Sequence, residues 1–256
     1  MTAGRALAQP PRIEWRAATV AAVIAETPRA KTLLLDVPGW PGHLPGQHVD
    51  VRLTAEDGYQ AQRSYSIASE PTSSTLAITI ERLDDGEVSP YLTDALQVGD
   101  RLEIRGPIGG YFVWEPSNAG PLFLVAGGSG VVPLMAMLRA RAVSSAADRT
   151  AAPATLLYSA RSLDEIIYRE ELAAIAKDPT VRVEYTLTRA RPEGWTGLRR
   201  RIDAAILSEL APSPTLNPYI YVCGPTGLVE TVGLLLVQLG HDPTRIRTER
   251  FGPTGP

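Results

Sequence analysis

The sequence predicts two domains, an antiparallel β-barrel followed by an α/β domain built on a parallel sheet. Short runs rich in valine, isoleucine, leucine and threonine fill the first part of the 256-residue chain, with glycine, proline and aspartate between them. Continuous apolar runs alternate with helical segments in the second part, as in a parallel sheet covered on both faces. A sandwich is the alternative arrangement for the first domain.

The domain limits follow from changes in composition. Residues 1–14 read as a loose tail, residues 15–116 as the β domain and residues 117–256 as the α/β domain. Proline, serine, asparagine and glycine gather at residues 115–121, which is typical of a linker. Both predicted domains fall in the common size range of about 100–150 residues.

Six strands are expected in the first domain, because each run is bounded by turn residues. They cover residues 19–25, 31–37, 48–53, 63–67, 76–80 and 101–105. A short helix is expected at 89–95, where Ser89 can cap the first turn and Pro90 suits the first helical position.

The second domain is expected to alternate strand and helix. The predicted strands are 122–126, 155–159, 182–188, 219–223 and 245–250, and the predicted helices are 133–143, 164–176, 202–209 and 226–239. Ligands of such sheets bind at the carboxyl ends of the strands, so those ends are where functional residues are expected.

Composition excludes several classes of function. The net charge of -3 gives no basic surface for nucleic acid or an anionic membrane. The single cysteine, Cys223, excludes an internal disulfide and an iron–sulfur cluster held by four thiolates of this chain. Three widely separated histidines offer no metal-ligand spacing, so no metal is expected. No signal peptide or long apolar run is seen, which favours a cytoplasmic protein without membrane insertion.

Two glycine-bearing turns follow predicted strands of the second domain. The first is 127–130, Gly-Gly-Ser-Gly, between a strand and a helix, where backbone N–H groups can hold a phosphate. An ordinary tight turn is the alternative. The second is 223–225, Cys-Gly-Pro, at the end of another strand. Two such turns at one sheet edge favour a dinucleotide site, although Cys223 also fits a buried core position.

The first domain carries Arg-Ser-Tyr-Ser at residues 63–66. A guanidinium suits a pyrophosphate, and Tyr65 lies two residues on, where it shares a face with Arg63 and can stack on a flat heterocycle. Ser66 points the other way unless the strand ends there. A solvent-facing arginine is the alternative for Arg63.

In this order the motifs resemble the ferredoxin–NADP reductase superfamily. They are Arg-x-Tyr-Ser at 63–66, Gly-x-x-Ser at 86–89, Gly-Pro-x-Gly at 106–109, Gly-Gly-Ser-Gly-x-x-Pro at 127–133, Cys-Gly-Pro at 223–225 and Glu-x-Phe at 249–251. The similarity is greatest to flavin reductase components of bacterial oxygenases, without an iron–sulfur domain, and extends over residues 15–251.

The resemblance implies a flavin site in the first domain. The FAD-binding residues would be Arg63, Ser64, Tyr65, Ser66, Gly86, Val88, Ser89 and Phe251. Among these, Arg63 would contact the pyrophosphate and Ser66 would lie near the hydride-accepting flavin N5. The 86–89 segment favours FAD over FMN, and the Gly106–Tyr111 segment would also help to hold the flavin.

The resemblance also implies a nicotinamide site in the second domain. Its residues would be Gly127, Gly128, Ser129, Gly130, Cys223, Gly224 and Pro225. The catalytic residues would be Ser66, Cys223 and Glu249, with Cys223 beside the nicotinamide C4. Phe251 would cover the flavin, but the chain continues past it to residue 256, which suggests an anchor for a tail instead of a mobile lid.

Arginines after the second and third strands of this domain could decide whether the hydride donor is NADPH or NADH. Arg161 and Arg189, with Arg191 close by, could hold the 2′-phosphate of NADPH. Exposed loop arginines compatible with NADH are the alternative, and we favour NADPH. The run Arg199–Arg201 could face an acidic redox partner, but a solvated helix start is expected.

The resemblance implies an FAD-dependent enzyme that takes hydride from NAD(P)H and passes electrons singly to a separate protein, a ferredoxin or an oxygenase component. We expect a monomer. Two other functions stay open at this point: a free-flavin reductase, and a nucleotide-binding electron-relay subunit of a larger complex.

Overall fold

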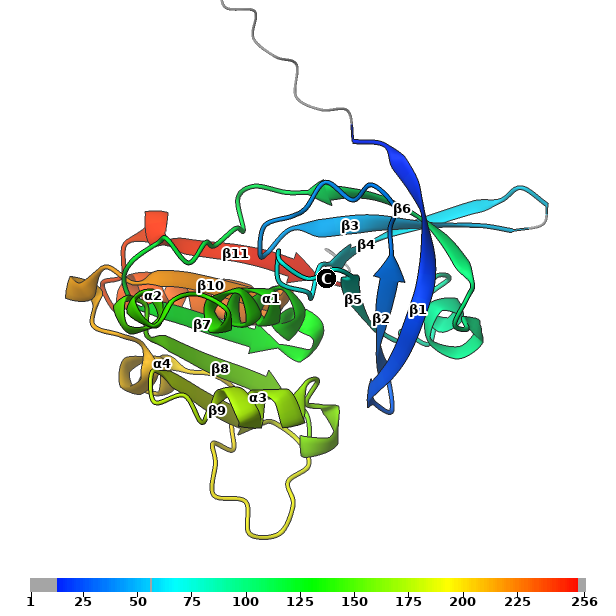
Figure 1. Cartoon of the computed structure of the whole chain (residues 1–256). Helices are drawn as coiled ribbons and strands as arrows, with labels where there is room; N and C mark the ends of the chain where they lie inside the picture. The colour runs from blue at the N-terminus through cyan, green and yellow to red at the C-terminus, as the bar shows by residue number, and fades with distance from the viewer. Residues whose placement is uncertain (1–12, 56, 253–256) are drawn as a thin grey trace, which may run out of the picture.

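The computed structural model describes residues 13–55 and 57–252, and it confirms both predicted architectures (Figure 1). The barrel lies on the right of the view and the α/β domain on the left. Most of the predicted tail, residues 1–12, and the end of the chain, residues 253–256, lie outside the described residues. The domain limits proposed above stay a prediction.

The first domain is one antiparallel sheet of six strands in the order β4-β3-β6-β1-β2-β5. The strands are β1 (Trp15–Thr27), β2 (Ala30–Asp36), β3 (His48–Thr54), β4 (Gln60–Ser66), β5 (Leu76–Glu81) and β6 (Arg101–Ile108). An antiparallel bridge between Ile67 and Ile78 joins the two outer strands, so the sheet closes into a barrel and not into a sandwich.

The barrel has its own apolar core. Alternate residues such as Leu33, Leu35, Ile78 and Ile80 are fully buried inside it, as the period of a strand requires. β1 begins at Trp15, four residues before the prediction, because its backbone pairs with β6 from there on, and the guanidinium groups of Arg52 and Arg105 cover the Trp15 ring.

The predicted helix at 89–95 is a short π-type turn (Tyr91–Ala95). Ser89 does not cap it, so that prediction is wrong. Its Oγ accepts instead from the backbone N–H of Leu83 at 3.0 Å and closes the preceding loop. Pro90 stands at the cap position and not inside the turn.

The second domain is a parallel sheet of five strands in the order β11-β10-β7-β8-β9. The strands are β7 (Leu122–Gly127), β8 (Ala154–Ala160), β9 (Val181–Leu187), β10 (Tyr219–Pro225) and β11 (Ile246–Phe251), and the helices are α1 (Val131–Ala142), α2 (Ala146–Ala151), α3 (Arg169–Ile175), α4 (Ala204–Leu210) and α5 (Thr226–Gln238). The order reverses at β7, so the strand ends on either side of it border one crevice.

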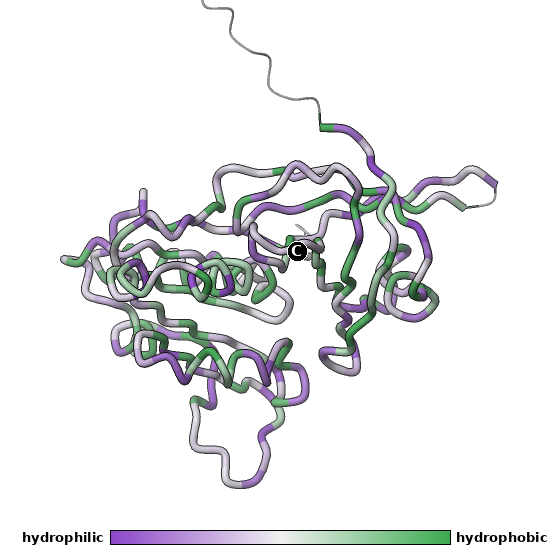
Figure 2. The backbone as a smooth tube through the Cα atoms, in the orientation of Figure 1, coloured by the Kyte–Doolittle hydropathy of each residue, from purple (hydrophilic) through white to green (hydrophobic). Residues whose placement is uncertain are grey.

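Helices cover both faces of this sheet. The core that contains α1 and α3 packs on one face, and the core that contains α4 and α5 packs on the other. Successive residues of β7 alternate between these cores, as Phe123 and Leu124 do. Figure 2 shows hydrophobic stretches along the strands of both domains.

The predicted helix at 164–176 is wrong in its first half. A short turn (Leu163–Glu165) is followed by Tyr168 with φ of 60°, and α3 begins only at Arg169. A left-handed tyrosine interrupts a helix at a steric cost, so contacts of Tyr168 must hold it there. The sequence analysis also missed α2, which Ser145 caps by accepting from the N–H of Asp148.

No helix within residues 13–55 and 57–252 has the length and apolar character needed to cross a membrane.

Candidate functional site

One cavity of about 1090 Å³ lies between the barrel and the carboxyl ends of the parallel strands. Both domains line it. The barrel contributes β4, the end of β5 and the loop before the helical turn, and the α/β domain contributes the turns after β7, β8 and β10. The two sets of motifs that the sequence places far apart therefore share a single cavity.

All four residues of the Arg-Ser-Tyr-Ser motif line the cavity. Arg63 forms an exposed ion pair with Glu87 at 3.4 Å, so it ties β4 to the 86–89 loop. Burial raises the pKa of Tyr65 to about 12, so its phenol stays protonated at neutral pH. Ser64 faces the barrel wall, where its hydroxyl donates to Asp50 at 2.6 Å.

Ser66 is the last residue of β4, which lets it face the cavity together with its neighbours. Only 4% of it is exposed, and its Oγ has no hydrogen-bond partner among the described residues. A buried hydroxyl without a partner is costly, so this one is poised for a ligand atom.

The loop at 86–89 lines the cavity with each of its residues. A Cβ on Gly86 would lie 2.9 Å from the Oγ of Ser89, so a larger residue there would have to displace that hydroxyl. Val88 is buried in the barrel core and holds the loop against it.

Gly127, Gly128 and Ser129 form the cavity wall at the end of β7. Gly128 has φ of 55°, and a Cβ on Gly127 would lie 2.8 Å from Leu228 Cδ1. Helix α1 follows at once, and the Val131 N–H at its start donates to the carbonyls of Gly128 and Ser129. A glycine turn of this kind is suited to cradle a phosphate group.

Gly130 packs between the turns after β7 and β10. It is buried, and a Cβ there would lie 2.1 Å from the carbonyl oxygen of Cys223. A Cβ on Gly224 would lie 2.9 Å from the carbonyl oxygen of Gly127. These glycines let the turns after β7 and β10 pack against each other, and neither is among the lining residues of the described chain.

Cys223 is fully buried and does not reach the cavity as the structure describes it. Burial, and then the nearby Glu249 carboxylate, raise the pKa of its thiol, so it stays protonated. The residues that follow do line the cavity, namely Pro225, Thr226 and Gly227. The Thr226 Oγ1, buried and without a described partner, is a second hydroxyl that can receive a ligand.

Glu249 also lies behind the cavity wall. Burial raises the pKa of its carboxyl to about 7, and its Oε2 has no partner in residues 13–55 and 57–252. Phe251, two residues later, is half-buried and lines the cavity.

Of the two arginines predicted to bind the 2′-phosphate, only one lines the cavity. Arg161 lines the cavity, whereas Arg189 is exposed and only its backbone N–H donates to the Arg161 carbonyl, at 2.9 Å. Arg201, expected above to be solvated, is exposed and also lines the cavity. Arg200 does behave as expected, because it pairs at 2.6 Å with Asp203, the cap of α4.

The segment Gly106–Tyr111 is not part of the cavity lining, so its expected place at the flavin is not seen here. Tyr111 reaches across to the other domain, where its hydroxyl donates to the carbonyl of Ile246 at 3.3 Å. Sequence reasoning also missed Glu81, whose carboxylate lies across from Gly128, and no local pattern points to it.

Two family models match the chain in the order of its domains. The Oxidoreductase FAD-binding domain matches residues 28–113, and the Oxidoreductase NAD-binding domain matches residues 124–233. Ferredoxin–NADP reductase B of Sorangium cellulosum is 36% identical over 213 residues, which cover 80% of this chain and 84% of that protein. The chain belongs to the ferredoxin–NADP reductase superfamily. It is an NAD(P)H-dependent FAD oxidoreductase.

Reductase components of oxygenases are also similar to this reductase. The glycine betaine monooxygenase reductase subunit of Chromohalobacter salexigens is 35% identical over 82% of the chain, which spans 56% of that longer protein. The crystal structure of an Amycolatopsis cytochrome P450 reductase is 25% identical, with a TM-score of 0.80, over 98% of this chain and 74% of that one.

The cavity of this reductase fits a flavin and a dinucleotide. Gly128 leaves open the space that a Cβ would fill, and the buried hydroxyls of Ser66 and Thr226 lack partners among the described residues. Arginines stand on either side, Arg63 on the barrel and Arg161 on the α/β domain, where they can neutralise phosphates.

Proposed function

We propose that this reductase takes hydride from NADPH to a bound FAD and passes the electrons singly to a separate ferredoxin or oxygenase component. The observation that carries the proposal is the single cavity lined by both the 63–66 motif and the glycine turn after β7. Hydride transfer needs the donor and acceptor rings in contact, and one cavity lined from both domains can hold them so.

The barrel residues would bind FAD. Arg63 and the 86–89 loop would hold the pyrophosphate, and the apolar face of Tyr65 would pack on the ring system. Val88 and Ser89 keep that loop in place through core packing and the bond to Leu83. A bound flavin supplies the conversion of one two-electron donation into two one-electron donations.

Ser66 and Glu249 would provide the polar groups near the reaction. The Ser66 hydroxyl would donate to the flavin, because it is the buried cavity group that lacks a partner among the described residues of β4. Glu249, with a pKa raised to about 7, can hold or release a proton at its carboxyl near neutral pH. Cys223, which lies beside Glu249 and packs on the glycine turn, would shape the floor under the nicotinamide from behind the cavity wall.

The dinucleotide would bind at the strand ends, and its 2′-phosphate would favour NADPH over NADH. Arg161 and Arg201 line the same cavity from the connections after β8 and before α4, with Ser159 and Thr188 beside them. Two guanidinium groups and two hydroxyls suit a phosphate dianion better than a ribose hydroxyl. Arg189, although predicted, contributes only its backbone here.

The acceptor would be a separate protein. The sequence has one cysteine, and no group of three histidine, cysteine, aspartate or glutamate side chains in the described part of the chain could hold a metal ion. The names of the oxygenase reductase relatives support an oxygenase partner.

Anaerobic stopped-flow reduction tests this function. Protein loaded with FAD is mixed with NADPH or NADH, and bleaching of the flavin bands is followed; we expect faster bleaching with NADPH. The reduced protein is then mixed with ferricyanide, a one-electron acceptor, and with a ferredoxin. Failure to bleach with either nucleotide would contradict the hydride step, and failure to reduce any acceptor would contradict the single-electron step.

A further inference from the structure

We propose that Tyr168 and Arg139 are positioning residues, a clamp between the domains that sets where the dinucleotide lies relative to the flavin. The expected effect on hydride transfer rests on the proposed function, because the clamp affects that rate only if the nicotinamide and flavin rings meet in the shared cavity. Neither residue touches the proposed cofactors. They hold the two halves of the cavity in one orientation.

Tyr168 makes two contacts with the barrel. Its hydroxyl shares a hydrogen bond with Thr79 Oγ1 of β5, and its backbone N–H donates to Glu26 Oε2 of β1 at 3.3 Å. Only 3% of the residue is exposed, and its φ of 60° is in the left-handed region. A non-glycine residue keeps that conformation only where its surroundings fix it, and here the surroundings belong to the other domain.

Arg139 makes the second connection. Its Nη1 donates to the carbonyl of Ala68 in the barrel at 2.7 Å, while its Nε and Nη2 bind both carboxylate oxygens of Glu171 at 2.8 and 2.6 Å. The guanidinium also lies over the ring of Tyr168, 4.8 Å from its centroid. The two residues thus support each other, and Glu171 fixes the direction of the arginine.

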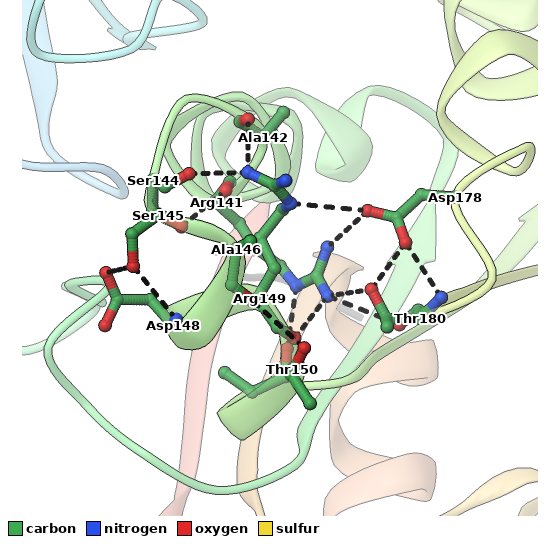
Figure 3. Close-up of polar contacts among 11 residues, drawn as sticks. Arg141, Ala142, Ser144, Ser145, Ala146, Asp148, Arg149, Thr150, Asp178 and Thr180 are labelled. Atoms are coloured by element: carbon green, nitrogen blue, oxygen red, sulfur yellow. Dashed lines mark hydrogen bonds and ion pairs between the residues drawn. The ribbon is translucent and has the colours of Figure 1, made fainter.

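Helix α1 links this clamp to the phosphate cradle. It starts directly after the 127–130 turn and carries Arg139 in its last turn. Arg141, two residues on, anchors the same helix end within its own domain, because it donates to the carbonyls of Ala152 and Arg149 at 2.7 Å each and to Thr180 (Figure 3). The buried helix therefore connects the phosphate cradle at its start to the barrel contact of Arg139 near its end.

On the barrel side the clamp meets the strands that carry the flavin-facing groups. Thr79 lines the main cavity, and Ala68 lies two residues after Ser66. A shift at the clamp would therefore move the dinucleotide cradle relative to Ser66. Displacement of reacting groups by about 1 Å can cost on the order of 100-fold in rate.

The clamp can be broken without separating the domains. Tyr168 and Arg139 line a second interdomain cleft of about 780 Å³, so they lie at the margin of the interface. A different junction remains at β10 and β11, where Tyr221 Oη and Arg247 Nη1 each donate to the Val113 carbonyl at 2.6 Å. Loss of the clamp should therefore permit a rotation about that junction.

The test uses the full-length FAD-loaded protein with Tyr168→Phe, Arg139→Gln and the double variant. Tyr168→Phe removes one hydroxyl and leaves Thr79 bonded to Thr32 at 2.7 Å. Arg139→Lys keeps the charge but loses the fork and should restore part of the lost rate. Matched controls are Tyr219→Phe and Arg182→Gln, which lie in the same domain away from the clamp.

We expect the double variant to lower the limiting rate of flavin reduction at saturating NADPH at least about tenfold. FAD occupancy and the Kd for NADP⁺ should stay within about twofold of the wild type, because no binding residue changes. In the chain without cofactor, peptides that contain Tyr168 should exchange amide hydrogens faster, while peptides from β7 and β8 stay unchanged.

An unchanged limiting rate in the double variant would overturn the proposal, and so would a loss of rate fully explained by weaker FAD or NADP⁺ binding. Exchange at Tyr168 that stays at the wild-type rate would overturn the clamp itself. If the wild type shows no flavin reduction, the proposed function fails, and the exchange experiment still decides whether these residues hold the domains together.

Discussion

Cys223 and Glu249 are register partners on the adjacent parallel strands β10 and β11. The carboxylate raises the pKa of the thiol, in addition to the larger effect of burial. The Glu249 carboxyl is itself buried with an oxygen that lacks a partner in the described structure, and its pKa is about 7. The pair thus places a protonated thiol beside a carboxyl that titrates near neutral pH, just behind the cavity wall.

Glu249 should make stability depend on pH. Its folded-state pKa of about 7 lies above the ordinary value of 4.5, so the folded state binds the extra proton and loses stability as the pH rises through 7. The stabilisation lost is on the order of 3 kcal/mol, at about 1.4 kcal/mol per pKa unit. Glu249→Gln, which cannot ionise, should flatten the dependence in thermal unfolding between pH 5 and pH 8. Parallel curves for the two proteins would contradict the raised pKa.

Ser66→Ala should slow hydride transfer and leave the free energy of unfolding almost unchanged. The hydroxyl makes no hydrogen bond to the described residues, so its removal should change the free energy of unfolding by less than about 0.5 kcal/mol. Hydride transfer to FAD should slow by about tenfold, since a group that would bind the flavin is lost. Urea unfolding and stopped-flow reduction measure the two effects. A rate equal to the wild type would place the hydroxyl outside the reaction.

Arg63→Ala should weaken FAD binding far more than folding. Its ion pair with Glu87 is exposed on both sides, and such pairs contribute about 0–1 kcal/mol. A lost guanidinium–phosphate contact should raise the Kd for FAD about tenfold or more. Flavin retained after gel filtration measures this. Glu87→Gln, which breaks the same pair, is the control and should retain FAD.

Arg161 and Arg201, but not Arg189, should select NADPH. Alanine at either cavity position should lower kcat/KM for NADPH by about tenfold or more and leave kcat/KM for NADH nearly unchanged, because only NADPH carries the 2′-phosphate. Arg189→Ala is the matched control, since its backbone bond to Arg161 survives. Equal losses with both nucleotides would assign the arginines to the shared pyrophosphate.

Gly130→Ala should damage the fold. Its Cβ would lie 2.1 Å from the Cys223 carbonyl oxygen, which is backbone and cannot move away without separating the turns after β7 and β10. We expect a loss of at least about 2 kcal/mol in the free energy of unfolding. Gly110→Ala has open space around its Cβ and serves as the control. Similar unfolding curves for both variants would contradict the close packing.

The sequence by itself determined the two-domain architecture and the order of the strands, although it missed α2 and misplaced the start of α3. Strand and helix periods are local, and so are the glycines of the 127–130 turn, whose place after an apolar run indicates a phosphate cradle. It also placed Arg63, Tyr65, Phe251 and Arg161 among the residues of the site, and all of them line the cavity.

Only the tertiary structure decided which segments meet. Gly130 packs on Cys223, more than ninety residues away, and Arg201 reaches the cavity where Arg189 does not. Tyr168 breaks a helix that its sequence favours, because hydrogen bonds to the barrel outweigh local propensity. Such outcomes depend on contacts between distant parts of the chain, which the periodicity of one segment does not encode.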